Sequence, residues 1–492
     1  MREIKKIQVS DHVAVALRDL KRGEQVLDNL TVLDDIPFGH KIALEDIPKG
    51  RAVIKYGQPI GCAARIIRRG EHVHSHNLVT GLSGLKEYTY EPVKQNEAAA
   101  SDSRQFFWGY QREDGRAGIR NEIWIVPTVG CVNKLAENLA ARANREYPGI
   151  TDGFFAFPHN MGCSQLGEDL LRTQKILSGL VHHPNAGGVL VLSLGCENNN
   201  LNSFREVLGE FPCGRVEFLT AQEAEDEYEE GLKKLEKLAR TAANDKRVRM
   251  GADKLTVGFK CGGSDGFSGI TANPLCGRIN DRIVSQGGTT FLTEVPEMFG
   301  AEQLLMNRAV SETVFRQTVK LINGYKQYFQ KYGQVIYENP SPGNKEGGIT
   351  TLEEKSLGCV QKGGQAAVSG VLDYGERPEG PGLYLLNGPG NDQISCTNLA
   401  ASGAQMILFT TGRGNPFGSA VPTVKISSNH MLSQRKPHWI DFDAGRMLDE
   451  EAGQTEEAFF SYLLQVASGE IRTRNEEREF REISIFRDGV IM

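Results

Sequence analysis

The sequence predicts a multidomain α/β protein, in which a small all-β module precedes α/β domains with largely parallel sheets. A short Gly-centred cassette recurs within residues 1–92, and a polar segment covers residues 93–103. Strand-like and helix-like segments then alternate along the rest of the chain, which is the pattern of α/β domains. We therefore divide the chain into an all-β module (1–92), a linker (93–103) and two α/β domains (104–248 and 249–492).

The cassette consists of an apolar residue, two spacers, Gly, two further spacers and a second apolar residue. It is centred on Gly23, Gly39, Gly50 and Gly70. Each Gly can supply the positive φ of a tight turn between short strands. Val and Ile dominate the flanking positions and favour strands.

The α/β elements follow from apolar runs and helical spacing. In the first α/β domain we expect strands over 119–127, 152–157 and 188–194, and helices over 132–147, 166–180 and 222–242. The third of these strands is almost entirely apolar, as is typical of a strand buried on both faces of a parallel sheet. In the second we expect strands over 255–259, 288–293, 382–386 and 405–410, and a long helix over 301–332.

Composition and charge exclude several classes of function. The 492 residues are 39% hydrophobic and 24% charged, which is ordinary for a globular protein. The net charge of -6 gives no reason to expect a nucleic-acid partner. No apolar run reaches the ~18 residues of a membrane span, and the N-terminus lacks the apolar region of a secretory signal, so we expect a cytoplasmic protein. Nine cysteines without a CxxC pair argue against a disulfide framework.

Five predicted strands end in turns rich in Gly, Cys and polar residues. These turns cover residues 129–131, 158–164, 194–199, 260–265 and 410–415. Ligands of open α/β sheets bind outside the carboxyl ends of the strands, so we expect the five turns to share one crevice. The chain has no GxGxxG after a strand and no GxxxxGK[ST], and we predict neither a dinucleotide site nor a P-loop.

Several side chains in these turns suit metal binding. Cys163, Cys196 and Cys261 each lie in one of them, with His159 and Glu197 beside the first two. His, Glu and thiolate can all bind a divalent transition metal. Alternatively, the cysteines are small packing residues in tight turns. Glu197 and His159 are the better candidates for a metal that also accepts substrate oxygens.

Two other turns favour a small anionic substrate over a nucleotide. Lys260 to Asp265 resembles an anion-binding turn, with backbone N–H groups exposed by two glycines. Arg413 lies between two glycines and can pair with a carboxylate.

The N-terminal module carries its own histidines. His72, His74 and His76 alternate along the chain and would share one face of a strand. They can hold a metal, or they form a polar strand end that faces water. His40 and Lys41 follow the turn residue Gly39 and can act as an acid/base pair or as an anion-binding charge.

The whole chain resembles the altronate/galactarate dehydratase family. The matching stretches are Gly39–Leu44, Gly109–Gly115, Arg120–Asn121, Gly195–Glu197, Cys261–Gly266, Thr271–Pro274 and Thr411–Gly414. Three more, His72–Asn77, Asn121–Ile125 and Val129–Lys134, look like the altronate branch. The resemblance implies a β-clip (SAF-type) N-terminal module joined to a large catalytic region. It also implies Fe(II), with Mn(II) as a replacement, and conversion of D-altronate to 2-keto-3-deoxy-D-gluconate in hexuronate breakdown.

Dehydration of a sugar acid removes the C2 proton next to the carboxylate and expels the C3 hydroxyl. A divalent metal would stabilise the enediolate, and a positioned base and acid would move the protons. We assign the catalytic roles to His40, Lys41 and His159. The predicted metal ligands are Glu197, His74, His76, Cys163 and Cys196. The predicted substrate-binding residues are Lys260, Ser264, Asp265, Arg413 and Asn121. The expected partner is a small sugar acid, with no nucleic acid or membrane, and a homo-oligomer stays open.

Four alternatives remain at this point. The first is that the substrate is another sugar acid such as galactarate. The second is that the chain is a sulfo-lyase that eliminates sulfite from a sulfolactate-type substrate on the same scaffold. The third is that it binds sugar acids without turnover, and the fourth is that it is an iron–sulfur dehydratase that uses Cys163, Cys196 and Cys261.

Overall fold

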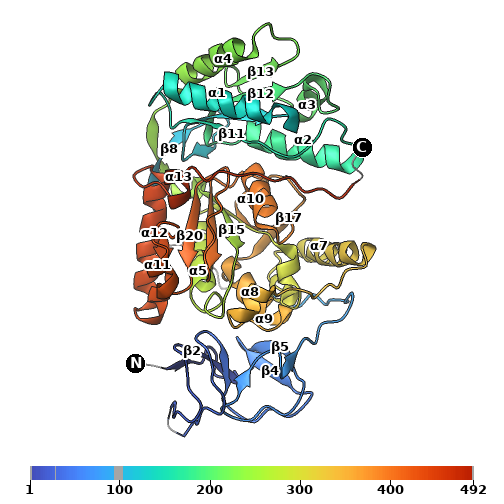
Figure 1. Ribbon diagram of the computed structural model, residues 1–492, viewed down its shortest axis with the longest axis vertical. Helices are drawn as coiled ribbons and strands as arrows, with labels where there is room; N and C mark the ends of the chain where they lie inside the picture. Colours follow the sequence, from blue (N-terminus) through green and yellow to red (C-terminus); the bar gives the residue numbers. More distant parts are fainter. Residues whose placement is uncertain (1–2, 28, 94–103, 490–492) are drawn as a thin grey trace.

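The computed structural model describes residues 3–27, 29–93 and 104–489. Its three parts are stacked along the long axis (Figure 1), with the N-terminal module at one end. The second region (104–251) lies at the other end, and the third region (252–489) lies between them. The predicted linker, apart from Val93, lies outside the described residues.

The N-terminal module is all-β, as predicted. One antiparallel sheet has the order β1-β2-β3-β6, and a second has the order β4-β5-β7. Gly23, Gly39, Gly50 and Gly70 have φ values of 90°, 82°, 79° and 91°, so each cassette glycine adopts the conformation that its turn requires. The strands are β1 (Ile4–Lys5), β2 (Val13–Ala16), β3 (Lys41–Ala43), β4 (Ala52–Lys55), β5 (Gln58–Ala63), β6 (His72–Val73) and β7 (Leu78–Val79).

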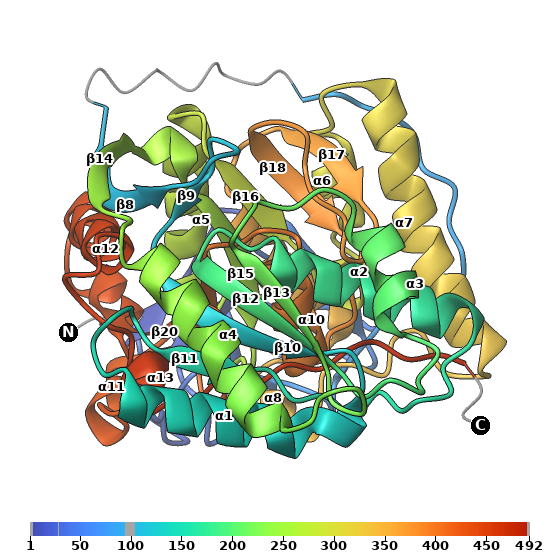
Figure 2. The same ribbon diagram turned by 90° about the horizontal axis from the view of Figure 1, so that it is seen from above.

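The second region is built on a parallel sheet with the order β11-β10-β12-β13. Its strands are β10 (Glu122–Pro127), β11 (Phe154–Ala156), β12 (Ala186–Ser193) and β13 (Val216–Thr220). Alternate side chains of β10 face two different cores. Ile123 and Ile125 pack with α1 (Asn133–Glu146) and α4 (Glu227–Ala242). Trp124 and Val126 pack with α2 (Gly167–Val181) and α3 (Leu201–Leu208). Figure 2, viewed from this end, shows α4 in front of the strands.

A small antiparallel sheet links the second region to the third. Its order is β14-β8-β9. β8 covers Phe106–Gln111, β9 covers Ala117–Gly118, and β14 covers Arg247–Gly251. β14 therefore spans the boundary that we predicted at residues 248 and 249.

The third region contains a seven-stranded parallel sheet with the order β17-β18-β16-β15-β19-β20-β21. The predicted largely parallel α/β architecture is confirmed. The chain runs from β15 to one edge of the sheet and then crosses back to β19, so the order reverses between β15 and β19. Ligands of such sheets bind at the carboxyl ends of the strands beside this switch point. The strands are β15 (Thr256–Cys261), β16 (Thr289–Leu292), β17 (Val368–Leu372), β18 (Gly382–Leu386), β19 (Met406–Thr411), β20 (Thr423–Ser427) and β21 (Phe442–Asp443).

Helices surround this sheet. They are α5 (Ala272–Ser285), α6 (Glu302–Met306), α7 (Glu312–Lys331), α8 (Pro342–Glu346), α9 (Leu352–Cys359), α10 (Asp392–Ala401), α11 (His430–Arg435), α12 (Ala452–Ala467) and α13 (Arg474–Glu477). Beyond the N-terminal sheets, residues 82–93 run along α7 (Figure 2), and the Tyr88 hydroxyl donates to Glu302 at 2.5 Å. None of the helices in residues 3–27, 29–93 and 104–489 is both long and apolar enough to cross a membrane.

Two predicted helices differ from the structure. The helix expected over 301–332 is interrupted between α6 and α7, because Ala309 pairs with Val368 beside the sheet and Ser311 caps α7. The helix expected from residue 222 begins at Glu227, where the side chain of Asp226 accepts hydrogen bonds from the first turn.

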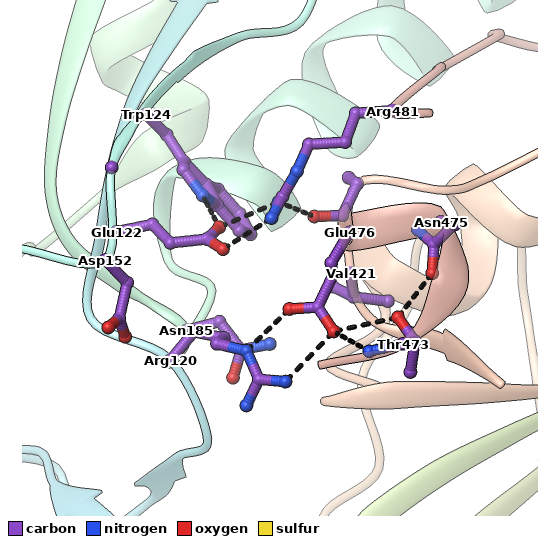
Figure 3. Close-up of polar contacts among 12 residues, drawn as sticks. Arg120, Glu122, Trp124, Asp152, Asn185, Val421, Thr473, Asn475, Glu476 and Arg481 are labelled. Carbon is purple, nitrogen blue, oxygen red and sulfur yellow. Dashed lines mark hydrogen bonds and ion pairs between the residues drawn. The ribbon is translucent and has the colours of Figure 1, made fainter. Parts of the chain in front are cut away.

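The C-terminal segment fastens the second region to the third (Figure 3). Arg120 donates two hydrogen bonds to Glu476, at 2.6 and 3.0 Å. Arg481 pairs in the same way with Glu122, at 2.8 and 3.0 Å. These side chains are buried or nearly so, and removing one partner would leave an unpaired charge. The Arg120–Asn121 motif is therefore a structural contact between two regions.

Candidate functional site

A cluster of buried ionisable groups lies at the switch point of the seven-stranded sheet. Cys261 ends β15, Glu297 follows β16, and Cys359 ends α9. The Sγ atoms of Cys261 and Cys359 are 3.4 Å apart, and each lies 3.1 Å from Oε2 of Glu297. Within the described ranges, no other three His, Cys, Asp or Glu side chains have ligand atoms all within 4.8 Å of one another. Two thiols and a carboxylate at this spacing are typical of ligands around a single ion.

Three lysines surround this cluster. Lys355 Nζ lies 2.8 Å from Glu297, Lys362 Nζ lies 3.1 Å from Glu294, and Lys260 also pairs with Glu294. Burial opposes the charged form of Lys355, but Glu297 outweighs it and raises the lysine pKa. Burial likewise opposes ionisation of Glu297, but the three lysines hold the pKa of that carboxyl well below its usual value. Both groups are therefore charged at neutral pH.

The thiols and the charges fit one divalent cation. The hydrogen bond with Cys261, together with burial, raises the pKa of Cys359 well above its usual value, so this thiol keeps its proton. The ammonium groups of Lys260, Lys355 and Lys362 then balance the carboxylates of Glu294, Glu297 and Asp392, which also pairs with Lys260 at 2.9 Å. A divalent cation held by two thiolates adds no net charge to this balance.

A cavity of about 460 Å³ opens beside the cluster. This is within the size range of small-molecule sites. Its walls are mostly polar, which suits a hydroxylated anion. The lining side chains include Cys261, Glu297, Glu338, Asn344, Lys345, Lys355 and Asp392.

A larger cavity of about 680 Å³ lies at the carboxyl ends of β17 and β18. Aromatic and basic side chains of α7 and α2 line it, among them Tyr325, Tyr328 and Arg172. The two cavities flank the loop of residues 387–392. We place the chemistry in the smaller cavity, because within the described residues it adjoins the compact set of metal-ligating groups.

The α8 segment lines this cavity and also contacts the N-terminal module. Asn344 donates to the carbonyl of Ser264 at 2.9 Å and accepts from Lys355 at 3.2 Å. The His40 Nε2 atom lies 3.0 Å from the carbonyl oxygen of Glu346, the last residue of α8. Arg413 donates to the Glu346 carboxylate at 2.9 Å. The module therefore packs against the segment that carries one wall of the cavity.

The predicted histidine cluster exists, although its strand is short. β6 covers only His72 and Val73, and a turn carries His74 and His76. The ring centroids of His40, His72, His74 and His76 nevertheless lie 5.0–5.5 Å from their nearest neighbours. Burial, followed by the neighbouring charges, lowers the pKa of His72 to about 3 and that of His74 to about 4. These rings are neutral at pH 7, but no three of the nitrogens in this described cluster meet the 4.8 Å spacing.

Lys41 docks the N-terminal module and cannot reach a substrate. Its side chain is 0% exposed and donates to Glu354 at 2.9 Å, Thr350 at 2.9 Å and the carbonyl of Gly348 at 2.7 Å. Lys55 donates to the other oxygen of Glu354 at 2.8 Å. The predicted catalytic role of Lys41 is therefore replaced by a structural one. His40 is also buried, between His72 and Glu346.

The predicted substrate-binding turn lies at the site, but most of its side chains already have partners. Lys260 is fully buried and donates to Glu294 and to the carbonyls of Cys261 and Gly390. The Asp265 carboxylate accepts from Ser268, Ser428 and Asn429. These two residues shape the turn and do not offer free groups to a ligand.

Two residues of the predicted set keep groups that a substrate could use. The buried Oγ of Ser264 has no hydrogen-bond partner. The side chain of Arg413 is 45% exposed.

Five predicted site residues lie in the second region. Three of the Gly/Cys turns follow β10, β11 and β12 of the four-stranded sheet, and the other two follow β15 and β19 of the seven-stranded sheet. The five turns therefore divide between two sheets, and of these turns only residues 261–263 line the cavity beside the cluster.

Glu197 and His159 hold their turns together. Glu197 is 2% exposed and accepts from Thr128, Ser193 and two backbone N–H groups at 2.6–3.1 Å. The Nδ1 atom of His159 accepts from the Met161 N–H at 3.2 Å, so Nε2 carries the hydrogen and donates to Pro127 O at 2.9 Å. Neither side chain keeps a free group for a metal or a proton transfer.

The remaining predictions in this region also change. Asn121 accepts from Arg112 at 3.0 Å and donates to Ala242 O at 2.8 Å, at the amino end of β10 and away from any ligand edge. It is a structural residue. Cys163 and Cys196 are exposed and carry free thiols.

Sequence reasoning missed Glu297, Cys359, Lys355 and Asp392. Glu294 and Glu297 directly follow the strand predicted over 288–293, and that position was a usable signal. Lys355 and Cys359 lie on α9, where the sequence contains no strand end or Gly-rich turn. Only the packing of α9 against the Val295–Met298 segment, which follows β16, brings them to Cys261.

Comparisons with known proteins cover the whole chain. A family model described as "Altronate/galactarate dehydratase SAF domain" matches residues 2–81. One described as "D-galactarate dehydratase/Altronate hydrolase, second domain" matches residues 109–243, and "D-galactarate/Altronate dehydratase, C-terminal" matches residues 252–491. The SAF-type assignment of the N-terminal module is confirmed.

Full-length relatives agree with these models. Altronate dehydratase of Bacillus subtilis (strain 168) is 50% identical over 100% of both chains, and that of Escherichia coli (strain K12) is 51% identical over 99% of each. Galactarate dehydratase (L-threo-forming) of E. coli is 32% identical over 96% of this chain and 94% of its own. The (2R)-sulfolactate sulfo-lyase subunit beta of Chromohalobacter salexigens is 31% identical over 74% of this chain and 92% of its own. This chain belongs to the altronate/galactarate dehydratase family.

Proposed function

We propose that this chain is a hydro-lyase that dehydrates D-altronate to 2-keto-3-deoxy-D-gluconate. The proposal is supported by identity of about half to two proteins named altronate dehydratase over essentially their full length. The observation that carries it in the structure is the Cys261–Glu297–Cys359 cluster, which opens with Lys355 onto a polar cavity of about 460 Å³.

The reaction requires a carboxylate to be held and a poorly acidic C2 proton to be removed. Lys355 remains charged at neutral pH, so it suits the substrate carboxylate and the negative charge of the enediolate. Lys345 lines the same cavity. Loss of the C3 hydroxyl, which leaves as water once protonated, gives the enol that tautomerises to the 2-keto product.

We assign removal of the C2 proton to Asp392. Its side chain is 31% exposed, while Lys260 and Asn415 hold its two oxygens in place at 2.9 and 2.8 Å. It is therefore oriented and still accessible to a ligand. In this proposal His40 has a structural role only, because it contacts the Glu346 carbonyl of α8.

Cys261, Glu297 and Cys359 would hold the divalent metal, for which we propose Fe(II). Two thiolates and a carboxylate suit Fe(II) better than Mn(II), which prefers oxygen ligands. When bound, the metal would act as a Lewis acid toward the substrate oxygens and stabilise the developing enediolate. His74 and His76, in the N-terminal module, stay an alternative pair of ligands.

Anaerobic turnover of a substrate panel tests this function. D-altronate, galactarate and sulfolactate are each supplied with Fe(II), Mn(II) or Mg(II), and 2-keto acid and sulfite are measured. We expect 2-keto-3-deoxy-D-gluconate from altronate with Fe(II), and at least about 100-fold lower kcat/KM for Lys355→Met, since about 3 kcal/mol of charge pairing is removed. Faster turnover of galactarate would assign the other branch of the family. Sulfite release would assign the sulfo-lyase reaction, and tight binding without product would leave a binding protein.

A small sugar acid as the partner, a role in hexuronate breakdown and a cytoplasmic location complete the proposal. They are supported by the names of the relatives and by the acidic, ordinary composition of the chain. A homo-oligomer stays a prediction, which the mass in solution by light scattering would decide.

A further inference from the structure

Three exposed cysteines lie at one edge of the four-stranded sheet. Cys131, Cys163 and Cys196 follow β10, β11 and β12, which are neighbours in the order β11-β10-β12. The strands are parallel, so the three turns emerge side by side. All three thiols are free and exposed. Free cysteines are usually buried, and three exposed thiols in adjacent turns therefore call for an explanation.

Direct hydrogen bonds join the three turns. The Gly130 N–H donates to the carbonyl of Met161 at 2.7 Å, which links the first turn to the second. The Asn198 N–H donates to the carbonyl of Cys163 at 2.9 Å, which links the second turn to the third. The Asn199 side chain donates to Thr128 O at 3.0 Å and closes the set. The cysteines therefore belong to a single surface.

Buried polar side chains fix this surface from below. Glu197 binds Thr128 and the backbone of the third turn, and His159 bridges the end of β10 and the second turn. A buried hydrogen-bond network of this kind makes a segment rigid. The network fixes the backbone of the three cysteine residues and leaves their thiols exposed to solvent, where a ligand can bind them.

The surroundings favour an anionic ligand. The helices α1, α2 and α3 begin two to five residues after Cys131, Cys163 and Cys196 respectively, and helix N-termini stabilise nearby negative charge. A Cβ at Gly162, next to Cys163, would meet nothing within 4 Å, so the space before this turn is open. The Gln222 amide, beyond β13, lies 3.7 Å from Cys196 Sγ and can donate to a bound sulfur.

We propose that Cys131, Cys163 and Cys196 bind a [4Fe–4S] cluster. Their sulfur atoms are not all within 4.8 Å of one another, as the ligand atoms around a single ion are. Within the described residues, only the set of Cys261, Glu297 and Cys359 has that spacing. Cysteines around a four-iron cluster stand further apart, because each binds a different iron. Each thiol loses its proton and forms one Fe–S bond, so a [4Fe–4S]²⁺ core releases three protons without a change of oxidation state. One iron keeps an open position.

This assignment replaces the cysteine set suggested by the sequence. Cys261 belongs to the other sheet, and Cys131 takes its place. The inference does not depend on the proposed dehydration of altronate.

Cluster content tests the proposal. The full chain is purified without oxygen and reconstituted with equal amounts of Fe(II) and Fe(III) and with sulfide, which together supply the charge of the core. We expect about four irons and four acid-labile sulfides per chain in excess of any single-ion site, with the broad visible absorbance of a cluster. Cys131→Ser, Cys163→Ser and Cys196→Ser should each reduce labile sulfide at least about fivefold.

Two matched variants complete the test. Cys213 is the remaining exposed cysteine in the described residues and lies before β13, at the amino end of the sheet, so Cys213→Ser should keep the full sulfide content. Cys261→Ser should also keep it. Circular dichroism checks that each variant is folded. Iron bound without labile sulfide, or sulfide content unchanged in the three serine variants, would overturn the assignment.

Discussion

Glu354→Gln should release the N-terminal module from α9. Glu354 is buried and receives hydrogen bonds from Lys41, Lys55 and the Thr350 N–H at 2.8–2.9 Å. Glutamine keeps the size of the side chain but removes its charge, so two buried ammonium groups lose their counter-ion. Breaking a buried pair by removing one partner costs about 3–5 kcal/mol.

The pKa of Glu354 gives the same magnitude. Burial opposes its ionised form, but Lys41 and Lys55 outweigh it and lower the pKa from 4.5 to about 2. At roughly 1.4 kcal/mol for each factor of ten in proton affinity, this difference corresponds to about 3 kcal/mol. A lowered carboxyl pKa stabilises the folded state above pH 4.5, and this contribution is lost as the pH falls through 2. The variant should therefore lose part of the wild-type pH dependence in that window.

Hydrogen exchange of the folded protein at pH 7 measures the effect region by region, since a chain of several domains has no single unfolding free energy. A loss of about 3 kcal/mol should speed exchange in β3, β5 and α9 by about two orders of magnitude, with little change in the four-stranded sheet. Glu312→Gln is the matched control, because Glu312 pairs with Arg316 on an exposed helix face. Exchange in Glu354→Gln within about threefold of this control would refute the reasoning.

Three further predictions follow from the buried clusters. Cys359→Ala should lower the amount of bound Fe(II) at least about tenfold, because it removes one of three ligands. Cys276 is also buried but lies outside the cluster, so Cys276→Ala should keep the metal. Equal metal content of the two variants by elemental analysis would contradict the site. Glu476→Gln should weaken the contact between the second and third regions by about 3 kcal/mol or more, because it leaves Arg120 unpaired; unchanged hydrogen exchange in β10 and α13 would contradict this. In the wild type, that contact should also lose stability as the pH drops from 4.5 to about 2. Burial opposes ionisation of Glu476, but Arg120 outweighs this effect and lowers the pKa of the carboxyl to about 2. The same acid-unfolding profile in the wild type and in Glu476→Gln would contradict this prediction.

Local patterns determined much of the architecture. Positive φ at Gly23, Gly39, Gly50 and Gly70 follows from the cassette, because a tight turn needs a residue without a side chain there. β12 and β18 follow from apolar runs, since strands buried on both faces need no polar alternation. The break at Ala309 did not follow, because a tertiary pairing with Val368 stops the helix.

The sequence also identified the residue types of the sites. It pointed to the turns after the strands, and thereby to Cys261, Cys163 and Cys196, because strand ends are visible in the apolar pattern. It could not tell that these cysteines lie at the edges of two different sheets. Strand order depends on how the layers pack, and no local pattern records it.

Which polar groups stay free was decided only by the tertiary structure. Glu197, His159 and Lys41 have the chemistry of site residues, yet partners from distant segments use their hydrogen-bonding groups. Glu297 and Cys359 gave weaker signals and meet Cys261 through the packing of α9. A side chain's chemistry is written in the sequence, but its availability depends on burial and on neighbours that only the folded chain supplies.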